Sequence, residues 1–139
     1  MKAHLTKTVL VLVVGLLLTN SIFAQSSLSE FTKNKYALDN LLMGIHSDNE
    51  GVRKSAIYFA GKYKVLESAE DLIAQLKKEE NPGIKVLIAL ALFEMESKEG
   101  LDAVRKLSKN DENLRVRNMA SFIYNEYANG NTVSNLKTR

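Results

Sequence analysis

The chain has 139 residues, with 19 lysines and arginines against 16 aspartates and glutamates, a formal net charge of +3, and no cysteine. This length allows one domain of ordinary size, and a hydrophobic fraction of 45% with 25% charged residues excludes a disordered or collagen-like chain. The absence of cysteine excludes disulfides, zinc fingers, iron–sulfur ligation and thiol catalysis.

Residues 1–24 have the three-part layout of a secretory signal peptide. Lys2 and Lys7 form a short positive stretch, residues 9–18 are an unbroken apolar run, and a polar stretch then ends at Ala24. The apolar run has ten residues, whereas a membrane-spanning helix needs about 20, which makes an uncleaved anchor the less favoured alternative. We therefore expect cleavage after Ala24, export to the periplasm or the cell exterior, and no membrane span after cleavage.

Removal of the signal peptide changes the charge balance. Lys2 and Lys7 leave with it, so 17 cations remain against 16 anions and the net charge falls to +1. So small a charge gives no electrostatic basis for nucleic-acid binding. We expect no nucleic-acid partner.

Three similar segments follow residues 25–34, which we expect to form an N-terminal cap or linker. An asparagine, a β-branched residue three positions later and a cation four positions later recur at a spacing of 32 residues, starting at Asn49, Asn81 and Asn113. Apolar residues continue downstream at helical spacing, so each segment predicts a helix with its asparagine as the N-cap. The middle segment, residues 84–93, is apolar nearly all round and is expected inside the fold.

A weaker series of helices alternates with these segments. An apolar triplet at positions i, i+1 and i+4 begins at Leu41, Leu72 and Ala103, and charged residues surround each triplet. This narrow stripe predicts outer helices that cover a core from one side. A capping box beginning at Ser68 is expected to start the second of them.

Each unit is thus an outer helix, a short turn and a more buried inner helix. Such a pair cannot bury its apolar face alone, and about three stacked pairs are needed for stability. The sequence predicts an all-α fold over residues 35–128, a right-handed α-solenoid of about three helix pairs. A stop signal at residues 128–131 predicts that 129–139 form a polar, loosely held tail. The three repeats are expected at about 35–64, 67–96 and 98–127.

The inner-helix pattern resembles that of the short bacterial HEAT-like repeat, with this chain as an exported member. Lys85 replaces the usual arginine in the second repeat, and asparagine stands in all three places where aspartate is commoner in the family. In that family the acidic residue and the arginine tend to form a ladder of ion pairs between successive repeats. Asparagine carries no charge, so the resemblance does not imply that ladder at these three positions. The best match is Asn49-x-x-Val52-Arg53-x-x-Ala56-x-x-x-Ala60-Gly61.

Residues that could carry catalysis or bind a metal are scarce. His46 is the only histidine after the signal peptide, so a two-histidine metal site cannot be built, and serine-based catalysis would have this one histidine as its only candidate base. We expect His46 to serve as a polar residue near the end of an outer helix. The sequence therefore predicts no catalytic residues, no metal site and no cofactor, and an enzyme is the least favoured class.

The resemblance implies a binding or scaffolding module without shared catalytic residues. The tyrosines and phenylalanines of the inner helices either fill the core and its two ends or line the face where repeat proteins bind partners. The leading hypothesis is a protein-interaction module with an unidentified protein partner, whose acidic segment would suit a basic face. The alternative is a structural subunit that self-associates through its terminal repeats. The candidate partner-binding residues are Arg53, Lys54, Tyr58, Lys85, Arg115, Arg117 and Tyr124.

Overall fold

A computed structural model describes the backbone of residues 35–137 and the side chains of residues 36–129. The predicted signal peptide 1–24, its cleavage point at Ala24 and the cap or linker at 25–34 lie outside the described residues. Residues 35–137 are all-helical and contain no strand, which confirms the all-α prediction. The helices are α2 (Lys35–Ile45), α3 (Glu50–Lys62), α4 (Ala69–Lys78), α5 (Pro82–Glu94), α6 (Lys98–Asn110) and α7 (Leu114–Lys137), with a 3₁₀ turn, η1 (Leu66–Ser68), before α4.

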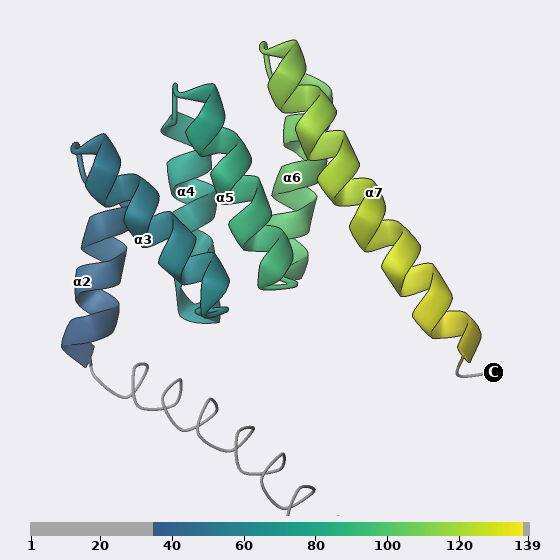
Figure 1. The fold of residues 1–139 in the computed structure, drawn as a ribbon, viewed down its shortest axis with the longest axis horizontal. Coiled ribbons are helices and arrows are strands. Elements are labelled where there is room, and N and C mark those ends of the chain that lie inside the picture. The colour runs from purple at the N-terminus through teal and green to yellow at the C-terminus, as the bar shows by residue number, and fades with distance from the viewer. Residues whose placement is uncertain (1–34, 138–139) are drawn as a thin grey trace, which may run out of the picture. The chain divides into compact units, whose positions relative to one another are not determined.

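The helices fall into two sets that match the predicted outer and inner helices. The inner helices α3, α5 and α7 lie side by side in front of the outer helices α2, α4 and α6 (Figure 1). Helix α5 packs between α3 and α7, and α4 contacts both α5 and α6. Each outer helix is followed by an inner one, giving three successive pairs: α2 with α3, α4 with α5, and α6 with α7.

The asparagine at the start of each inner helix is its N-cap, as predicted. The side-chain oxygen of Asn49 accepts hydrogen bonds from the amides of Gly51 at 3.0 Å and Val52 at 3.1 Å. Asn81 and Asn113 make the equivalent pairs of bonds at the starts of α5 and α7. Three of the helix starts therefore follow directly from a residue that satisfies otherwise unpaired amides.

The predicted capping box at Ser68 is wrong. Ser68 precedes α4 but makes no capping bond, and its hydroxyl donates instead to the carbonyl of Val65 at 2.7 Å. The reason is that η1 leads into α4, so Ser68 has helical rather than extended backbone angles. The serine that does cap an outer helix is Ser97, whose hydroxyl accepts from the amide of Gly100 at 3.1 Å.

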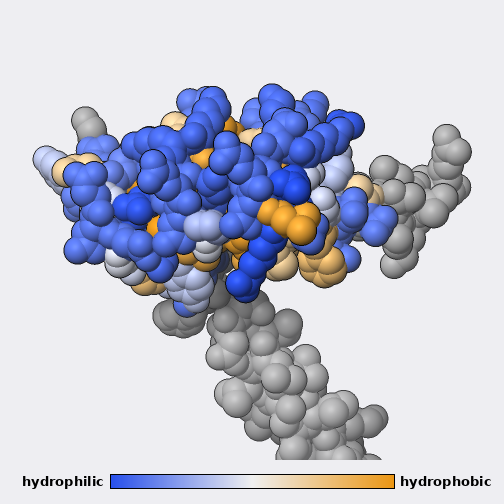
Figure 2. Space-filling view, turned by 90° about the horizontal axis from the view of Figure 1, so that it is seen from above, coloured by the Kyte–Doolittle hydropathy of each residue, from blue (hydrophilic) through white to orange (hydrophobic). Residues whose placement is uncertain are grey.

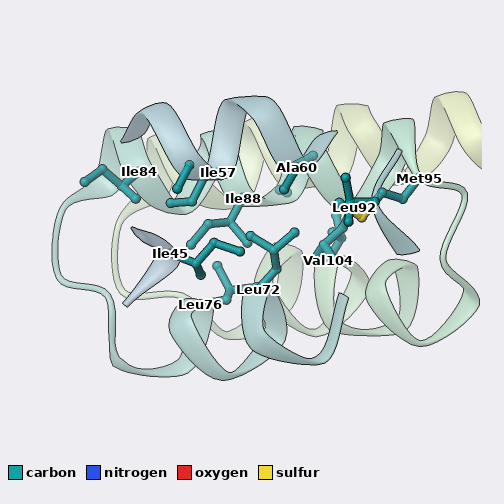
Figure 3. Close-up of a cluster of buried hydrophobic side chains, with 14 of the residues drawn as sticks. Ile45, Ile57, Ala60, Leu72, Leu76, Ile84, Ile88, Leu92, Met95 and Val104 are labelled. Carbon is teal, nitrogen blue, oxygen red and sulfur yellow. The ribbon is translucent and has the colours of Figure 1, made fainter. Parts of the chain in front are cut away.

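The core lies between the inner and outer layers. Figure 3 shows Ile88 and Leu92 of α5 beside Leu72 of α4 and Val104 of α6, and all four are fully buried. Helices α3 and α5 approach so closely that a Cβ built on Gly61 would lie 2.7 Å from the Cα of Ala91. Only glycine fits at that point of the α3–α5 contact.

Helix α7 continues past the predicted stop. It runs to Lys137, so residues 129–137 are helical rather than the predicted loose tail. A single glycine with asparagine neighbours costs a helix only about 1 kcal/mol relative to alanine, and no proline follows to end it. Across residues 35–137, none of the helices combines the length and apolar character needed to cross a bilayer.

Candidate interaction surface

One large apolar residue per inner helix is exposed at the same position of the 32-residue repeat. These are Tyr58 on α3, Leu90 on α5 and Phe122 on α7, with 51%, 40% and 63% of their surface exposed. We call these three residues the apolar row. Because α3, α5 and α7 are neighbours in one layer, the row crosses three adjacent helices (Figure 1).

The burial pattern of α3 fixes the direction in which the row points. Ala56 and Ala60 are buried in the core, two positions to either side of Tyr58. Positions two apart on a helix are about 200° apart, so Tyr58 lies opposite the core side of α3. Gly61 lies against α5. The apolar row therefore belongs to the face of the inner layer turned away from the outer helices.

Charged residues border the apolar row one helical turn further along each helix. The bordering residues are Lys62, Glu94 and Glu126, all exposed. The Lys62 ammonium lies over the ring of Tyr58, 5.6 Å from its centroid, and over that of Tyr63 at 5.5 Å. The border is thus positive on α3 and negative on α5 and α7.

The apolar row is broadest on the second and third inner helices. Val86 and Leu87 are half-buried beside Leu90, and Met119 is 39% exposed beside Phe122. The corresponding residues on α3 are polar and exposed: Lys54 and Ser55. In contrast, the end of the molecule where α3, α5 and α7 begin is mainly hydrophilic (Figure 2). Apolar surface suited to a partner is therefore found along the inner layer.

Arg53 and Lys85, two of the predicted partner-binding residues, are placed in contacts between successive helix pairs. The Nε of Arg53 lies 2.8 Å from Oε2 of Glu79, and the Nζ of Lys85 lies 2.6 Å from Oδ2 of Asp111. The Arg53 side chain is only 14% exposed and that of Lys85 only 21%. Both cations are thus committed to holding one helix pair on the next.

We call the two ion pairs, Arg53–Glu79 and Lys85–Asp111, the ladder. Its acids lie two residues before the capping asparagines. Oε1 of Glu79 accepts from the amide of Asn81 at 3.1 Å, and Oδ1 of Asp111 accepts from the amide of Asn113 at 2.9 Å. Each carboxylate therefore supports the turn before an inner helix while it pairs with the preceding pair's cation.

The pKa values of both ladder acids are lowered. Burial alone would raise the pKa of Glu79, but hydrogen bonds from Gln75, Arg53 and the Asn81 amide outweigh it. Burial likewise opposes ionisation of Asp111, while the hydrogen bond from Lys85 and that from the Asn113 amide lower its pKa. Both groups are held in the charged form by the contacts that join the helix pairs.

The other predicted residues have separate surroundings. Arg117 donates to the carbonyl oxygens of Asp111 and Glu112 at 2.6 and 3.0 Å, as Arg53 does to those of Ser47 and Asp48. Lys54 pairs with Glu50 on the exposed side of α3. Arg115 is exposed, and Tyr124 is half-buried under the guanidinium of Arg105 at 5.7 Å. Of the seven predicted residues, only Tyr58 is part of the apolar row.

Leu90 is a functional candidate that the sequence did not single out, and Phe122 was considered only as one of the aromatic residues of the inner helices. The sequence does contain a pattern that points to them, because both residues occupy the same repeat position as Tyr58. That position lies opposite the buried stripe of each inner helix, and a large apolar residue there in every repeat is the pattern that marks an exposed row.

The two ends of the helix stack differ in polarity. Val52 and Phe59 of α3 are 49% and 44% exposed, whereas the residues at the same repeat positions of α5 and α7 are buried against the preceding helix pair. At the other end, Ser121 and Asn125 of α7 occupy positions that are apolar or glycine in the first two pairs. Among the described side chains of residues 36–129, the first pair therefore ends in an apolar edge and the last in a polar one.

His46 lies in a polar contact between outer helices. Its Nε2 is 2.7 Å from Oδ1 of Asp71, and its Nδ1 is 3.2 Å from Oε1 of Gln75. No group of three or more acidic or histidine side chains that could hold a metal is found within the described part of the chain. His46 therefore joins α2 to α4, a contact that accounts for its position near the end of α2.

Comparison with known proteins gives no match to a family model, to a curated protein or to a solved structure.

Proposed function

We propose that this chain is an exported protein-interaction module that binds a partner protein through the apolar row. In this proposal residues 1–24 direct export to the periplasm or the cell exterior, and the helix pairs form a right-handed α-solenoid of HEAT-like repeats. The observation that carries the proposal is the exposure of Tyr58, Leu90 and Phe122 at one repeat position across three adjacent helices.

Support comes from the regularity of the apolar row. Single exposed apolar residues are ordinary on protein surfaces, but here one exposed apolar position recurs on three neighbouring helices, and clustered exposed apolar residues mark interaction sites. The described residues offer no comparable case for catalysis, since the one histidine among them is engaged with Asp71 and Gln75. Stacked helix pairs also present their inner layer as a broad binding surface.

Self-association is the second candidate function, and the exposed edge of the first helix pair favours it. Val52 and Phe59 stand where α5 and α7 bury equivalent residues, so another copy could cover them. The polar edge formed by Ser121 and Asn125 opposes stacking at the other end. A contact between two first-pair edges is therefore the form of self-association that the residues support.

Capture experiments on paired variants separate the two functions. Leu90→Ser with Phe122→Ser removes two members of the apolar row, and Val52→Ser with Phe59→Ser is the matched control on the exposed edge. All four residues are at least 40% exposed, so we expect each substitution to cost less than the roughly 2–5 kcal/mol of a core truncation and to leave the protein folded. The row variant should lose a partner cross-linked from the cell envelope, and the edge variant should retain it. Equal capture by both variants would place the binding site elsewhere.

A further inference from the structure

We propose that the occupant of the apolar row is an amphipathic helix of the partner, which lies across α3, α5 and α7 with apolar residues seven positions apart. The helix carries an acidic residue beside α3 and basic residues beside α5 and α7. This inference rests on the proposed function and specifies the chemistry of its partner.

The spacing of the inner helices sets the spacing of the partner's apolar residues. Packed helices lie about 8–10 Å apart, so Tyr58, Leu90 and Phe122 recur at about that interval. Seven residues of an α-helix rise about 10.5 Å and return to nearly the same side. A helix with apolar residues at positions i, i+7 and i+14 therefore places one against each member of the row.

The polar groups around the apolar row favour a helix over an extended segment. An extended segment would need partners for its own amides and carbonyls, which a helix satisfies internally. Of the six residues four positions before or after a member of the row, only Asn118 has a side-chain amide. The remaining neighbours are charged or apolar, which suits a helix with an apolar stripe and charged flanks. The flanking residues are Lys54, Val86 and Asn118 on one side and Lys62, Glu94 and Glu126 on the other.

The charges beside the apolar row specify the charges of the helix. Lys54 is already paired with Glu50. Lys62, Glu94 and Glu126 are exposed, and none of them forms an ion pair with another of the described residues. A partner that carries an acid opposite Lys62 and bases opposite the two glutamates satisfies all three charges. Such complementarity fixes the direction in which the helix lies.

Three labelled synthetic peptides test the helix directly. The first is a 21-residue helix-forming peptide with leucines seven apart, glutamate beside the first leucine and lysines beside the others. The second has the same composition, but its leucines are six residues apart, so that they no longer lie on one side of the helix. The third is an extended proline-rich peptide with leucines three apart. Fluorescence anisotropy against the purified protein gives each dissociation constant, and circular dichroism reports helix formation on binding.

The first peptide should bind saturably and at least about tenfold more tightly than the other two. Leu90→Ser or Phe122→Ser should weaken it about tenfold, whereas Val52→Ser should leave it unchanged. Lys62→Glu should weaken it, and a peptide with lysine in place of the first glutamate should restore the affinity. Equal binding of the second peptide, or tighter binding of the third, would overturn the helical occupant.

The result also separates this inference from the proposed function. If no peptide binds but the row variant still loses the cross-linked envelope partner, the apolar row is a binding site and the helical occupant is refuted. If the peptide binds and Leu90→Ser has no effect, the helix lies elsewhere and the inference fails. If the row variant loses neither the peptide nor the envelope partner, the apolar row is not the binding site and both proposals fail.

Discussion

Arg53 of α3 joins the first helix pair to the second through Glu79, with 2.8 Å between Nε and Oε2 and both side chains largely buried. Oε2 of the same carboxylate also accepts from the side-chain amide of Gln75 at 2.9 Å, and its Oε1 accepts from the backbone amide of Asn81. Glu79 thus connects α3, α4 and the start of α5. Lys85 and Asp111 repeat the contact one helix pair later.

Loss of the Glu79 carboxylate should destabilise the fold. We expect Glu79→Ala to lower the free energy of unfolding by about 2–4 kcal/mol, because Arg53 and the Asn81 amide lose a buried partner. Lys54→Ala is the matched control, since it breaks the ion pair with Glu50 on the exposed surface and should leave the urea midpoint nearly unchanged. Urea titration followed by circular dichroism measures both. Equal midpoint shifts would show that Glu79 contributes no more than a surface charge.

The ladder should also make stability depend on pH. The pKa values of Glu79 and Asp111 are lower in the folded protein than usual, so protons bind these groups more weakly in the folded state than in the unfolded one. Their contribution to stability is therefore complete above the unfolded pKa values of about 4 and is lost as the pH falls through the folded values. We expect the free energy of unfolding to decrease steadily below about pH 4.5.

A variant with Glu79→Gln and Asp111→Asn tests the origin of this decrease. It should be less stable at pH 7 and should lose less stability than the original protein between about pH 4.5 and 2.5. Asp102→Asn, on the exposed surface of α6, is the control and should keep the original pH profile. Parallel profiles for the original protein and the double variant would assign the acid sensitivity to other groups.

Repeat spacing and helix caps could be predicted from the sequence because their causes are local. Asn49 accepts from amides two and three residues away, and such bonds depend little on the rest of the fold. The ladder could not be predicted this way, since Glu79 meets Arg53 across 26 residues. The cap predicted at Ser68 is wrong because the 3₁₀ turn η1 leads into α4 and gives Ser68 helical backbone angles.

The interaction surface was predicted only in part, for a related reason. A cation on an inner helix looks the same in the sequence whether it faces solvent or an acid of the next pair. Arg53 and Lys85 were therefore expected on the binding face, yet each is paired between helix pairs. Leu90 and Phe122 look like core residues by type alone, and only the burial of their neighbours reveals their exposure.

Gly61 should be essential to the contact between α3 and α5. A Cβ at this position would lie 2.7 Å from the Cα and 2.8 Å from the Cβ of Ala91, so one helix must shift to admit it. We expect Gly61→Ala to cost about 1–3 kcal/mol of unfolding free energy despite the better helix propensity of alanine. Gly51→Ala is the milder comparison, because a Cβ there meets only the side-chain oxygen of Asn49, at 3.3 Å, and no backbone atom of another helix, so we expect it to cost less than Gly61→Ala. An unchanged urea midpoint for Gly61→Ala would show that the helices separate without cost.

The unequal edges of the helix stack should limit self-association. A contact between two identical first-pair edges closes on itself, so we expect sedimentation velocity to show no species larger than a dimer, and Phe59→Ser to weaken any dimer.

Ser121→Ala with Asn125→Phe gives α7 the residues that α5 has at these positions, Ala89 and Phe93. That variant gains a second apolar edge that differs from the first, and such head-to-tail contacts extend into chains. We therefore expect it to form larger species whose size grows with concentration. If it stays no larger than a dimer, the polarity of the α7 edge is not what limits assembly.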